Sequence, residues 1–286
     1  MNTLYLNGKY CDISEATIPV TDRSFLFGEG LFESFRSFDG KIPLLKDHIN
    51  RLEWSTTFLD LPFPKTDFQK ICDQLLEKNK LKDARFKIIF SRAGQSSLDN
   101  VDTVDAVDTK INLIVFCEPY DEKKTPPVYR LKTERGVVND PLPLAAIKTT
   151  NYLHKVYARR IAQEAGYNDA ILLNAKGFVT ETTTSNIFWV DKDAHLFTVA
   201  SEQGLLDGVM KKTLKELFVK SKLTCKEGYI TPDDFSSARE IFVTNSVIGV
   251  KPVVAVDLRQ ISGGEEGPIT EMVRELWRKK TESSQV

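Results

Sequence analysis

Lys148 stands where a side-chain amine could act as a nucleophile. Apolar residues 143–147 precede it, and the polar residues 149–151 can cap a helix that starts near Tyr152. An amine at the end of an apolar segment is partly desolvated, loses its proton more easily and can attack a carbonyl group. The same local sequence also fits a solvated lysine in front of a helix, so Lys148 needs support from elsewhere in the chain.

A carboxylate and a phosphate cradle are the next candidates along the chain. Glu181 is followed by five small polar residues, 182–186, which predict either a loop that wraps polar atoms around a ligand or a plain surface turn. A carboxylate in such a loop can pair with a protonated ring nitrogen. The segment 206–210 opens a lysine-rich helix with Gly208, where backbone N–H groups can bind phosphate, although glycine is common near helix starts.

Weaker candidates lie in both halves of the chain. Arg51 could donate a pair of hydrogen bonds to a phosphate, or could be a solvated helix arginine. Residues 244–246 end a β-rich strand and offer small polar donors, or form an ordinary turn. No cysteine or histidine pair has metal-ligand spacing, so we expect reduced thiols and no metal site. These residues are Cys11, Cys72, Cys117, Cys225, His48, His154 and His195.

The composition is that of an ordinary globular protein. The chain has 286 residues, with 39 basic and 40 acidic side chains and a formal net charge of -1. This balance gives no electrostatic reason to expect a nucleic acid or an anionic membrane as partner. No apolar run approaches the ~20 residues that span a bilayer. The first residues lack a basic start followed by an apolar core, so we expect no signal peptide and a cytoplasmic protein.

The pattern of elements predicts an α+β protein of two domains. A charged, proline-rich stretch separates a domain of residues 1–118, through a linker at 119–127, from a larger domain of residues 128–286. Strands outnumber helices in both halves, which favours antiparallel or mixed sheets. We expect hairpins at 4–10 and 32–44, helices at 45–59, after Asp67, at 152–165, 208–222 and 268–280, and strands at 85–91, 110–116, 169–173, 186–190, 195–199, 240–244 and 250–256.

Taken together and in this order, the candidate residues resemble the class IV aminotransferases, the fold-type IV enzymes of pyridoxal 5′-phosphate (PLP). Members include branched-chain aminotransferases, D-amino acid aminotransferases and 4-amino-4-deoxychorismate lyases. The resemblance runs from about Gly28 to Val253. It covers the glycine turn 27–30, Arg51 after His48, Lys148 with 151–153, and segments 164–167, 177–186, 206–209 and 244–253.

The resemblance implies a D-amino acid aminotransferase-like fold of two α+β domains, with PLP between them, in a homodimer. Lys148 would hold PLP as a Schiff base and shuttle a proton between the substrate Cα and the cofactor. Glu181 would face the pyridine nitrogen. The other implied cofactor contacts are Tyr152 to the ring oxygen, Leu206 against the ring, and Arg51, Gly208, Val209, Met210, Asn245 and Ser246 around the phosphate. Phe32 and Val247 would face the substrate.

The choice within the family is less well defined. D-amino acid enzymes carry an arginine and histidine pair that residues 92–98 lack, and a tyrosine where this chain has Phe32, so we do not expect D-amino acids. Met210 and Asn245 resemble the lyases, whereas residues 151–153 are common in aminotransferases. We rank transamination between a branched-chain-like L-amino acid and a 2-oxo acid first. A lyase releasing pyruvate and p-aminobenzoate comes second, and a non-catalytic binding protein last.

Overall fold

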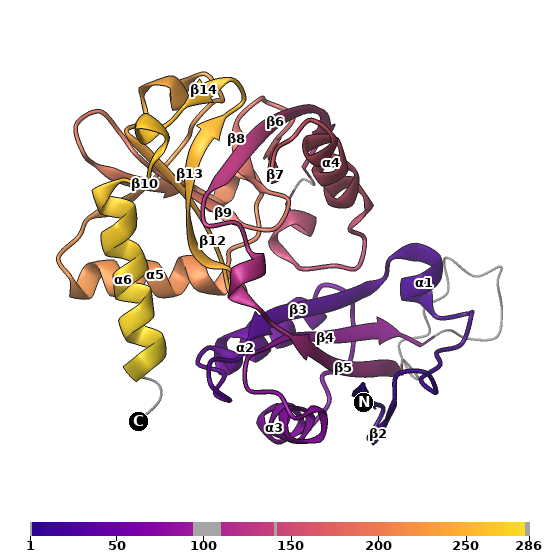
Figure 1. The fold of residues 1–286 in the computed structure, drawn as a ribbon. Helices are drawn as coiled ribbons and strands as arrows, with labels where there is room; N and C mark the ends of the chain where they lie inside the picture. The colour runs from indigo at the N-terminus through magenta and orange to yellow at the C-terminus, as the bar shows by residue number, and fades with distance from the viewer. Residues whose placement is uncertain (1, 94–109, 140–141, 284–286) are drawn as a thin grey trace. The chain divides into compact units, whose positions relative to one another are not determined.

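Contacts divide the protein into two compact units, which are described separately. The computed structural model describes residues 2–93, 110–139 and 142–283. Unit 1 consists of Met1–Asp121 and Ile147–Tyr152, and unit 2 of Glu122–Ala146 and Leu153–Val286 (Figure 1). The short segment Ile147–Tyr152 thus packs with unit 1, although the sequence around it belongs to unit 2. The predicted domain boundaries at residues 118 and 128 stay a prediction.

Unit 1 is built on a five-stranded antiparallel sheet. Its strand order is β2-β1-β5-β4-β3, and helices α2 and α3 pack on it. The strands are β1 (Thr3–Leu6), β2 (Lys9–Asp12), β3 (Gly30–Arg36), β4 (Ala84–Arg92) and β5 (Ile111–Pro119). The helices are α1 (Arg23–Phe27), α2 (Leu45–Thr56) and α3 (Phe68–Asn79).

Local signals in the sequence account for several of these elements. Asn7 and Gly8 both have positive φ, at 47° and 93°, as a two-residue hairpin turn requires, which confirms the first hairpin. Asp67 accepts a hydrogen bond from the backbone of Lys70 at 2.9 Å and caps α3 as predicted. The second predicted hairpin is wrong. Only its turn forms, closed by an isolated Phe38–Lys41 bridge, and residues 42–44 add no strand to β3.

Strand β3 separates two kinds of side chain by its alternation. Leu31 and Phe35 lie in the apolar core of unit 1, and Glu33 falls on the same face. This face meets α2. Phe32 points to the opposite face of the sheet. The strand therefore places a buried acid against a helix and an aromatic ring on the other side.

Unit 2 is built on a mixed sheet of nine strands. Its order is β11-β10-β9-β12-β13-β6-β7-β8, with β14 beside β13, and the β10–β11, β13–β6 and β6–β7 pairs are parallel. The strands are β6 (Tyr129–Val138), β7 (Asp169–Leu173), β8 (Val179–Thr182), β9 (Asn186–Val190), β10 (Leu196–Val199), β11 (Cys225–Gly228), β12 (Glu240–Asn245), β13 (Gly249–Val256) and β14 (Arg259–Gln260).

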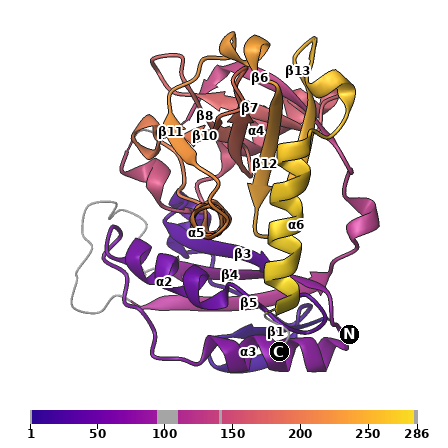
Figure 2. The ribbon, with the colours of Figure 1, turned by 90° about the vertical axis from the view of Figure 1, so that its left-hand side faces the viewer.

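Three helices pack within unit 2. They are α4 (Leu153–Glu164), α5 (Val209–Lys220) and α6 (Pro268–Ser283). Helix α4 packs on β6 and β7, α5 on β12, and α6 on β12 and β13 (Figure 2). The predicted α+β class, with antiparallel and mixed sheets, is confirmed. Strand β6 is an element that the sequence analysis did not predict.

The predicted polar loop around Glu181 is wrong for its first residues. Glu181 and Thr182 belong to strand β8, and all four residues of that strand are buried. A tight turn follows, in which the Thr182 hydroxyl accepts a hydrogen bond from the Ser185 backbone at 2.9 Å. Thr183 donates to Asp169 from the same turn. The small polar side chains thus satisfy one another inside unit 2, which also excludes the surface turn.

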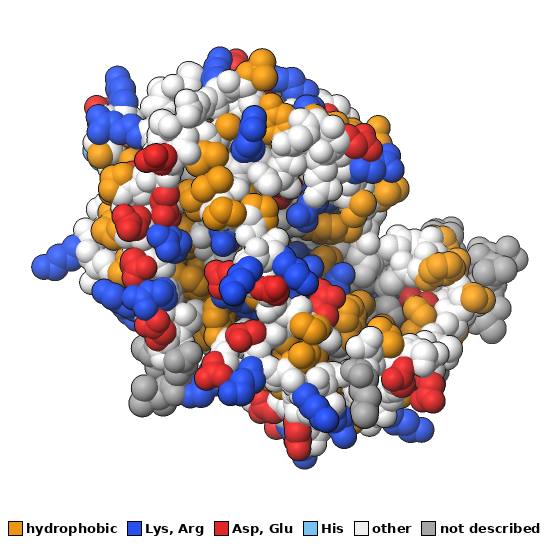
Figure 3. Space-filling view, in the orientation of Figure 1, with side chains coloured by type: hydrophobic (Ala, Val, Ile, Leu, Met, Phe, Trp, Pro, Cys, Tyr) orange, Lys and Arg blue, Asp and Glu red, His pale blue; other side chains and the backbone are white. Residues whose placement is uncertain are grey.

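The surface carries charges of both signs. Figure 3 shows acidic and basic side chains interspersed over one face, as a net charge of -1 would lead one to expect. Among the helices of the described residues, none combines the length and the apolar character that crossing a bilayer requires.

Candidate active site

Lys148 lies on a segment that extends the sheet of unit 1. Phe32 N donates to Lys148 O at 2.8 Å, and Thr150 N donates to Gly30 O at 2.8 Å. Leu31 and Thr149 form an antiparallel bridge between these bonds. Lys148 is therefore carried by a hydrogen-bonded edge of β3 rather than by a free loop.

Two aromatic rings flank the Lys148 amine. Its Nζ lies 4.4 Å from the centroid of the Phe32 ring and 5.5 Å from that of the Tyr152 ring. The two rings meet edge to face, with centroids 5.4 Å apart. Unit 1 thus brings together the predicted lysine, the tyrosine and the substrate-side phenylalanine. Aromatic faces around an amine shield it partly from water and attract it when it is charged.

Arg51 is held by an acid that the sequence analysis did not single out. Arg51 donates to both oxygens of Glu33, from Nε at 2.7 Å and from a terminal nitrogen at 2.6 Å. His48, one turn earlier on α2, lies 2.7 Å from the same carboxylate through Nδ1. The predicted phosphate contact of Arg51 stays a prediction, and Glu33 fixes the orientation in which Arg51 would make it.

Arg51 controls the ionisation of this buried cluster. Burial by itself would raise the pKa of Glu33, but the charges of Arg51 and His48 and their hydrogen bonds outweigh burial and lower the pKa to about 2. Burial also lowers the pKa of His48, against the opposing effect of Glu33. Of these two charges, that of Arg51 lowers the pKa of Glu33 more, so Arg51 is the cation on which the ionised Glu33 mainly depends.

In unit 2, Glu181 is buried and paired with Lys155. The Lys155 Nζ lies 2.8 Å from Glu181 Oε1. Asn139 and the backbone N–H of Leu206 approach the same oxygen, each at 3.4 Å. Glu181 and Leu206, both predicted site residues, are thus brought together. Among the described residues, every hydrogen bond that Glu181 accepts ends on Oε1, which leaves Oε2 for another donor.

The predicted phosphate cradle forms the start of helix α5. Gly208 is the N-cap residue, and no side chain caps the helix start. The N–H groups of Val209 and Met210 belong to the first turn, where backbone donors have no partner within the helix. A Cβ atom on Gly208 would lie 2.1 Å from Asn186 Oδ1. Asn186 in turn donates to Leu206 O at 2.8 Å. Glycine at position 208 therefore leaves room for the Asn186 side chain to hold the backbone at residue 206.

The turn after β12 contains the remaining predicted residues. The side-chain oxygen of Asn245 accepts from the backbone of Val247 and Ile248, both at 2.9 Å, and its amide donates to Ser185 at 2.9 Å. Asn245 is therefore committed to shaping the turn on which Ser246 and Val247 lie. Next to it, the Thr244 hydroxyl is buried with no hydrogen-bond partner among the described residues.

Two buried lysines on helices, Lys155 and Lys211, were not singled out from the sequence, although each is marked there by its apolar helix face. Lys155 shares one face of α4 with the buried Ala158 and Ala162, at spacings of three and seven residues. Lys211 shares one face of α5 with Leu214 and Phe218 in the same way. A lysine at a position where the helix is otherwise apolar predicts a buried partner. The Lys211 Nζ donates to Val199 O and Ser201 Oγ, each at 3.1 Å.

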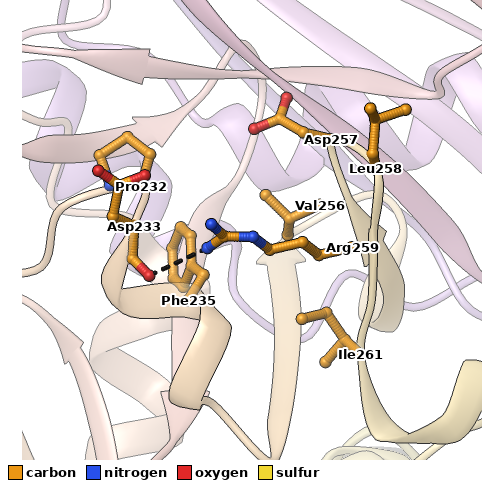
Figure 4. A pocket seen from close by; sticks show the side chains of 8 residues that line it. All are labelled: Pro232, Asp233, Phe235, Val256, Asp257, Leu258, Arg259 and Ile261. Atoms are coloured by element: carbon orange, nitrogen blue, oxygen red, sulfur yellow. Dashed lines mark hydrogen bonds between the residues drawn. The ribbon is translucent and has the colours of Figure 1, made fainter.

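A separate hollow lies elsewhere in unit 2. It has a volume of about 230 Å³, and Arg259 donates across it to Asp233 O at 3.2 Å (Figure 4). The Asp257 carboxylate at its rim is already bonded to Thr133. None of the predicted site residues lines this hollow, whose lining consists of Pro232, Asp233, Phe235, Val256, Asp257, Leu258, Arg259 and Ile261.

Comparison with known proteins decides the family. The family model described as amino-transferase class IV matches residues 30–256, which include Lys148 and the other site residues. This protein belongs to the class IV aminotransferases. Enzymes of that family depend on PLP, and solved structures of the same fold carry pyridoxyl ligands.

Relatives of this class IV protein carry different activities in their names. The "Putative branched-chain-amino-acid aminotransferase" of Methanocaldococcus jannaschii is 32% identical over 96% of this chain and 95% of its own. A D-alanine aminotransferase of Staphylococcus haemolyticus is 27% identical over 99% of each chain. An aminodeoxychorismate lyase of Bacillus subtilis is 27% identical over 97% and 94%.

The fold agrees with this membership. The branched-chain aminotransferase of Thermoproteus uzoniensis, solved with norvaline, superimposes with a TM-score of 0.85. The match covers 99% of this chain and 95% of that one at 24% identity. Such a likeness shows a shared fold, while the substrate has to be argued from the residues.

The Glu33 cluster predicts a defined pH dependence. A carboxyl group whose pKa falls from 4.5 to about 2 on folding adds stability above pH 4.5, and loses it as the pH falls towards 2. We expect Glu33→Gln to lower the free energy of unfolding by about 3 kcal/mol at pH 7. Urea denaturation should show this difference shrinking between pH 4.5 and 2.

The exposed pair of Glu118 with Arg85 provides the control. Its atoms are 3.7 Å apart and both side chains are about half exposed. Glu118→Gln should change stability by less than about 1 kcal/mol at any pH. A pH-independent effect of Glu33→Gln would contradict the role given to the Glu33 charge.

The close approach at Gly208 predicts a specific rescue. Gly208→Ala should displace Asn186, disturb the start of α5 and weaken PLP binding at least about tenfold, since the loss of an orienting partner has that scale. Fluorescence titration with PLP measures the effect. Removing the obstacle in Gly208→Ala/Asn186→Ala should recover part of the affinity. Gly228→Ala, whose Cβ meets only ordinary contacts at 3.4–3.5 Å, should bind PLP normally.

Proposed function

We propose that this enzyme carries PLP on Lys148 and transfers an amino group between a branched-chain-like L-amino acid and a 2-oxo acid. The observation that carries the proposal is the placement of Lys148. Its amine is flanked by Phe32 and Tyr152 on a hydrogen-bonded edge of the sheet, within the region that matches the family. A rigid support holds a nucleophilic amine in position to attack a bound carbonyl group.

Groups of unit 2 suit the polar ends of PLP. Glu181 offers a carboxylate oxygen for the pyridine nitrogen, and the start of α5 offers N–H groups for the phosphate. The buried hydroxyl of Thr244, which has no partner among the described residues, is a further donor of the kind that a phosphate needs. When bound, PLP supplies an electron sink for bonds at the substrate Cα.

The protein's own residues then have distinct tasks. Lys148 Nζ would move the proton from the substrate Cα. Arg51, steadied by Glu33, would contact the phosphate, as would Ser246 and the N–H groups of Val209 and Met210. Tyr152 would hydrogen-bond the ring oxygen, and Leu206 would pack against the ring. Phe32 and the turn at Val247 would face the substrate.

Several finer points belong to the same proposal. The branched-chain preference is supported by the relative at 32% identity, whose name carries that activity. Phe32 stands where D-amino acid enzymes have a tyrosine, which argues against D-alanine as substrate. The segment 92–98 also lacks the arginine and histidine pair of those enzymes, and its residues 94–98 lie outside the described residues. A homodimer and a cytoplasmic location are proposed from the sequence alone.

The first test concerns the lysine itself. Purified protein reconstituted with PLP should absorb in the visible range, and borohydride reduction should fix the cofactor on Lys148. Lys148→Ala should lose the visible band and all activity. The matched control is Lys87→Met, because the Lys87 Nζ also lies over the Phe32 ring, at 4.6 Å. Attachment of PLP to another lysine would refute the assignment.

The second test distinguishes the three activities found among the relatives. The enzyme is offered L-leucine with 2-oxoglutarate, D-alanine with 2-oxoglutarate, and aminodeoxychorismate. We expect glutamate from the leucine reaction, at a kcat/KM at least about a hundredfold above that for D-alanine, equivalent to about 3 kcal/mol. Release of p-aminobenzoate with no reaction of leucine would make the protein a lyase.

A further inference from the structure

A buried ion pair links helix α4 to the proposed cofactor acid. Lys155, the third residue of α4, is buried, and its Nζ lies 2.8 Å from Oε1 of the buried Glu181. Lys155 comes from the helix face that carries Ala158 and Ala162, which pack with Ala170 and Leu172 in an apolar cluster. Placing an ammonium there requires a partner, and Glu181 provides it.

Stability alone gives no strong reason for a lysine at this position. An apolar side chain of similar length would fill the same space, and such replacements of buried ion pairs are often neutral or stabilising when both charges go. Glu181 cannot be replaced in this way if it serves the cofactor. Lys155 is then needed because a buried carboxylate without a cation is strongly unfavourable.

The contacts of Glu181 show what Lys155 achieves. Lys155, Asn139 and the Leu206 backbone all approach Oε1, at 2.8, 3.4 and 3.4 Å. Asn139 is itself fixed by a 2.8 Å bond to Gly204 O. Three donors on one oxygen set the rotation of the carboxylate and leave Oε2 as the oxygen that can meet a ligand.

From this arrangement, and resting on the proposed function, we infer that Lys155 is a positioning residue that pairs with Oε1 of Glu181 and so presents Oε2 to the pyridine nitrogen of PLP. Lys155 does not touch the substrate. Its effect on the cofactor passes through Glu181.

The test is a double-mutant cycle on the PLP-loaded enzyme, using Lys155→Met, Glu181→Gln and the double variant. We expect Lys155→Met to lower kcat about ten- to a hundredfold, the usual effect of losing an orienting partner, with little change in KM. The pH midpoint of the visible PLP band should shift, because Glu181 loses the partner that orients its carboxylate towards the ring nitrogen. In the Glu181→Gln background, Lys155→Met should change neither quantity further.

Three further variants separate charge, hydrogen bonding and general effects. Lys155→Arg keeps the charge and should restore most of kcat and the midpoint. Lys155→Gln keeps a donor but no charge, and should restore less. Lys215→Met removes a lysine of α5 that pairs with Glu227 at 2.7 Å on the surface, and should behave like wild type.

The outcomes distinguish the inference from the proposed function. Melting of each apoprotein reports folding, so a variant that only unfolds is recognised and Lys155→Gln takes the place of Lys155→Met. A folded Lys155→Met enzyme with wild-type kcat and midpoint overturns the inference, as does an equal effect in the Glu181→Gln background. Wild-type protein that fails to attach PLP at Lys148 overturns the proposed function, and this inference with it.

Discussion

The antiparallel bridge between residues 30–32 and 148–150 is the constraint on which the candidate site depends. Two backbone hydrogen bonds of 2.8 Å join segments that are more than a hundred residues apart in sequence. They attach Lys148 to an edge of β3, and β3 is itself paired with β4 along its length. Closing so long a loop costs conformational entropy, which the sheet and the core around Ile147 must offset. A lysine supported in this way has little freedom, and pre-organisation of this kind lowers the cost of reaching a reactive geometry.

The two units solve the same electrostatic problem in similar ways. Each buries a carboxylate and satisfies it with a cation from a neighbouring helix. In unit 1, Arg51 of α2 serves Glu33, and in unit 2, Lys155 of α4 serves Glu181. The geometry differs in a way that suits the roles. Arg51 donates through its planar guanidinium group to both oxygens of Glu33. Both carboxylate oxygens of Glu33 are therefore occupied by hydrogen bonds within the protein. Lys155 is a single point donor that engages one oxygen of Glu181 and leaves the other.

Short-range signals in the sequence predicted much of this fold. The Asn7-Gly8 hairpin, the Asp67 cap and the glycine at the start of α5 each depend on a few adjacent residues, and each is found where expected. The failures involve distant partners. Residues 41–44 were expected to form a strand that returns beside β3, but β3 forms its ladder with the distant strand β4. Residues 182–186 were expected to form a polar loop after Glu181, but Glu181 and Thr182 belong to the buried strand β8, which pairs with β7, and a tight turn follows. Lys148 and Glu181 could be chosen from their residue types and their order in the chain. Lys155 stands out only once the helix face on which it lies is known to be buried.

The same distinction bears on the choice between transamination and lyase chemistry. Met210 and Asn245 are the two residues that resemble the lyases in sequence. In the structure, Met210 is 1% exposed and is one of the buried residues of α5. The Asn245 side chain is occupied by two backbone N–H groups of its own turn and by the turn after β8. Both side chains therefore belong to the scaffold of unit 2 around the start of α5 and the turn after β12. The identity of residues 210 and 245 therefore reflects how unit 2 is packed, and a transaminase and a lyase can have the same packing. The lyase resemblance thus loses weight as evidence about chemistry, and the deprotonation of the substrate Cα proposed for Lys148 would be common to both activities.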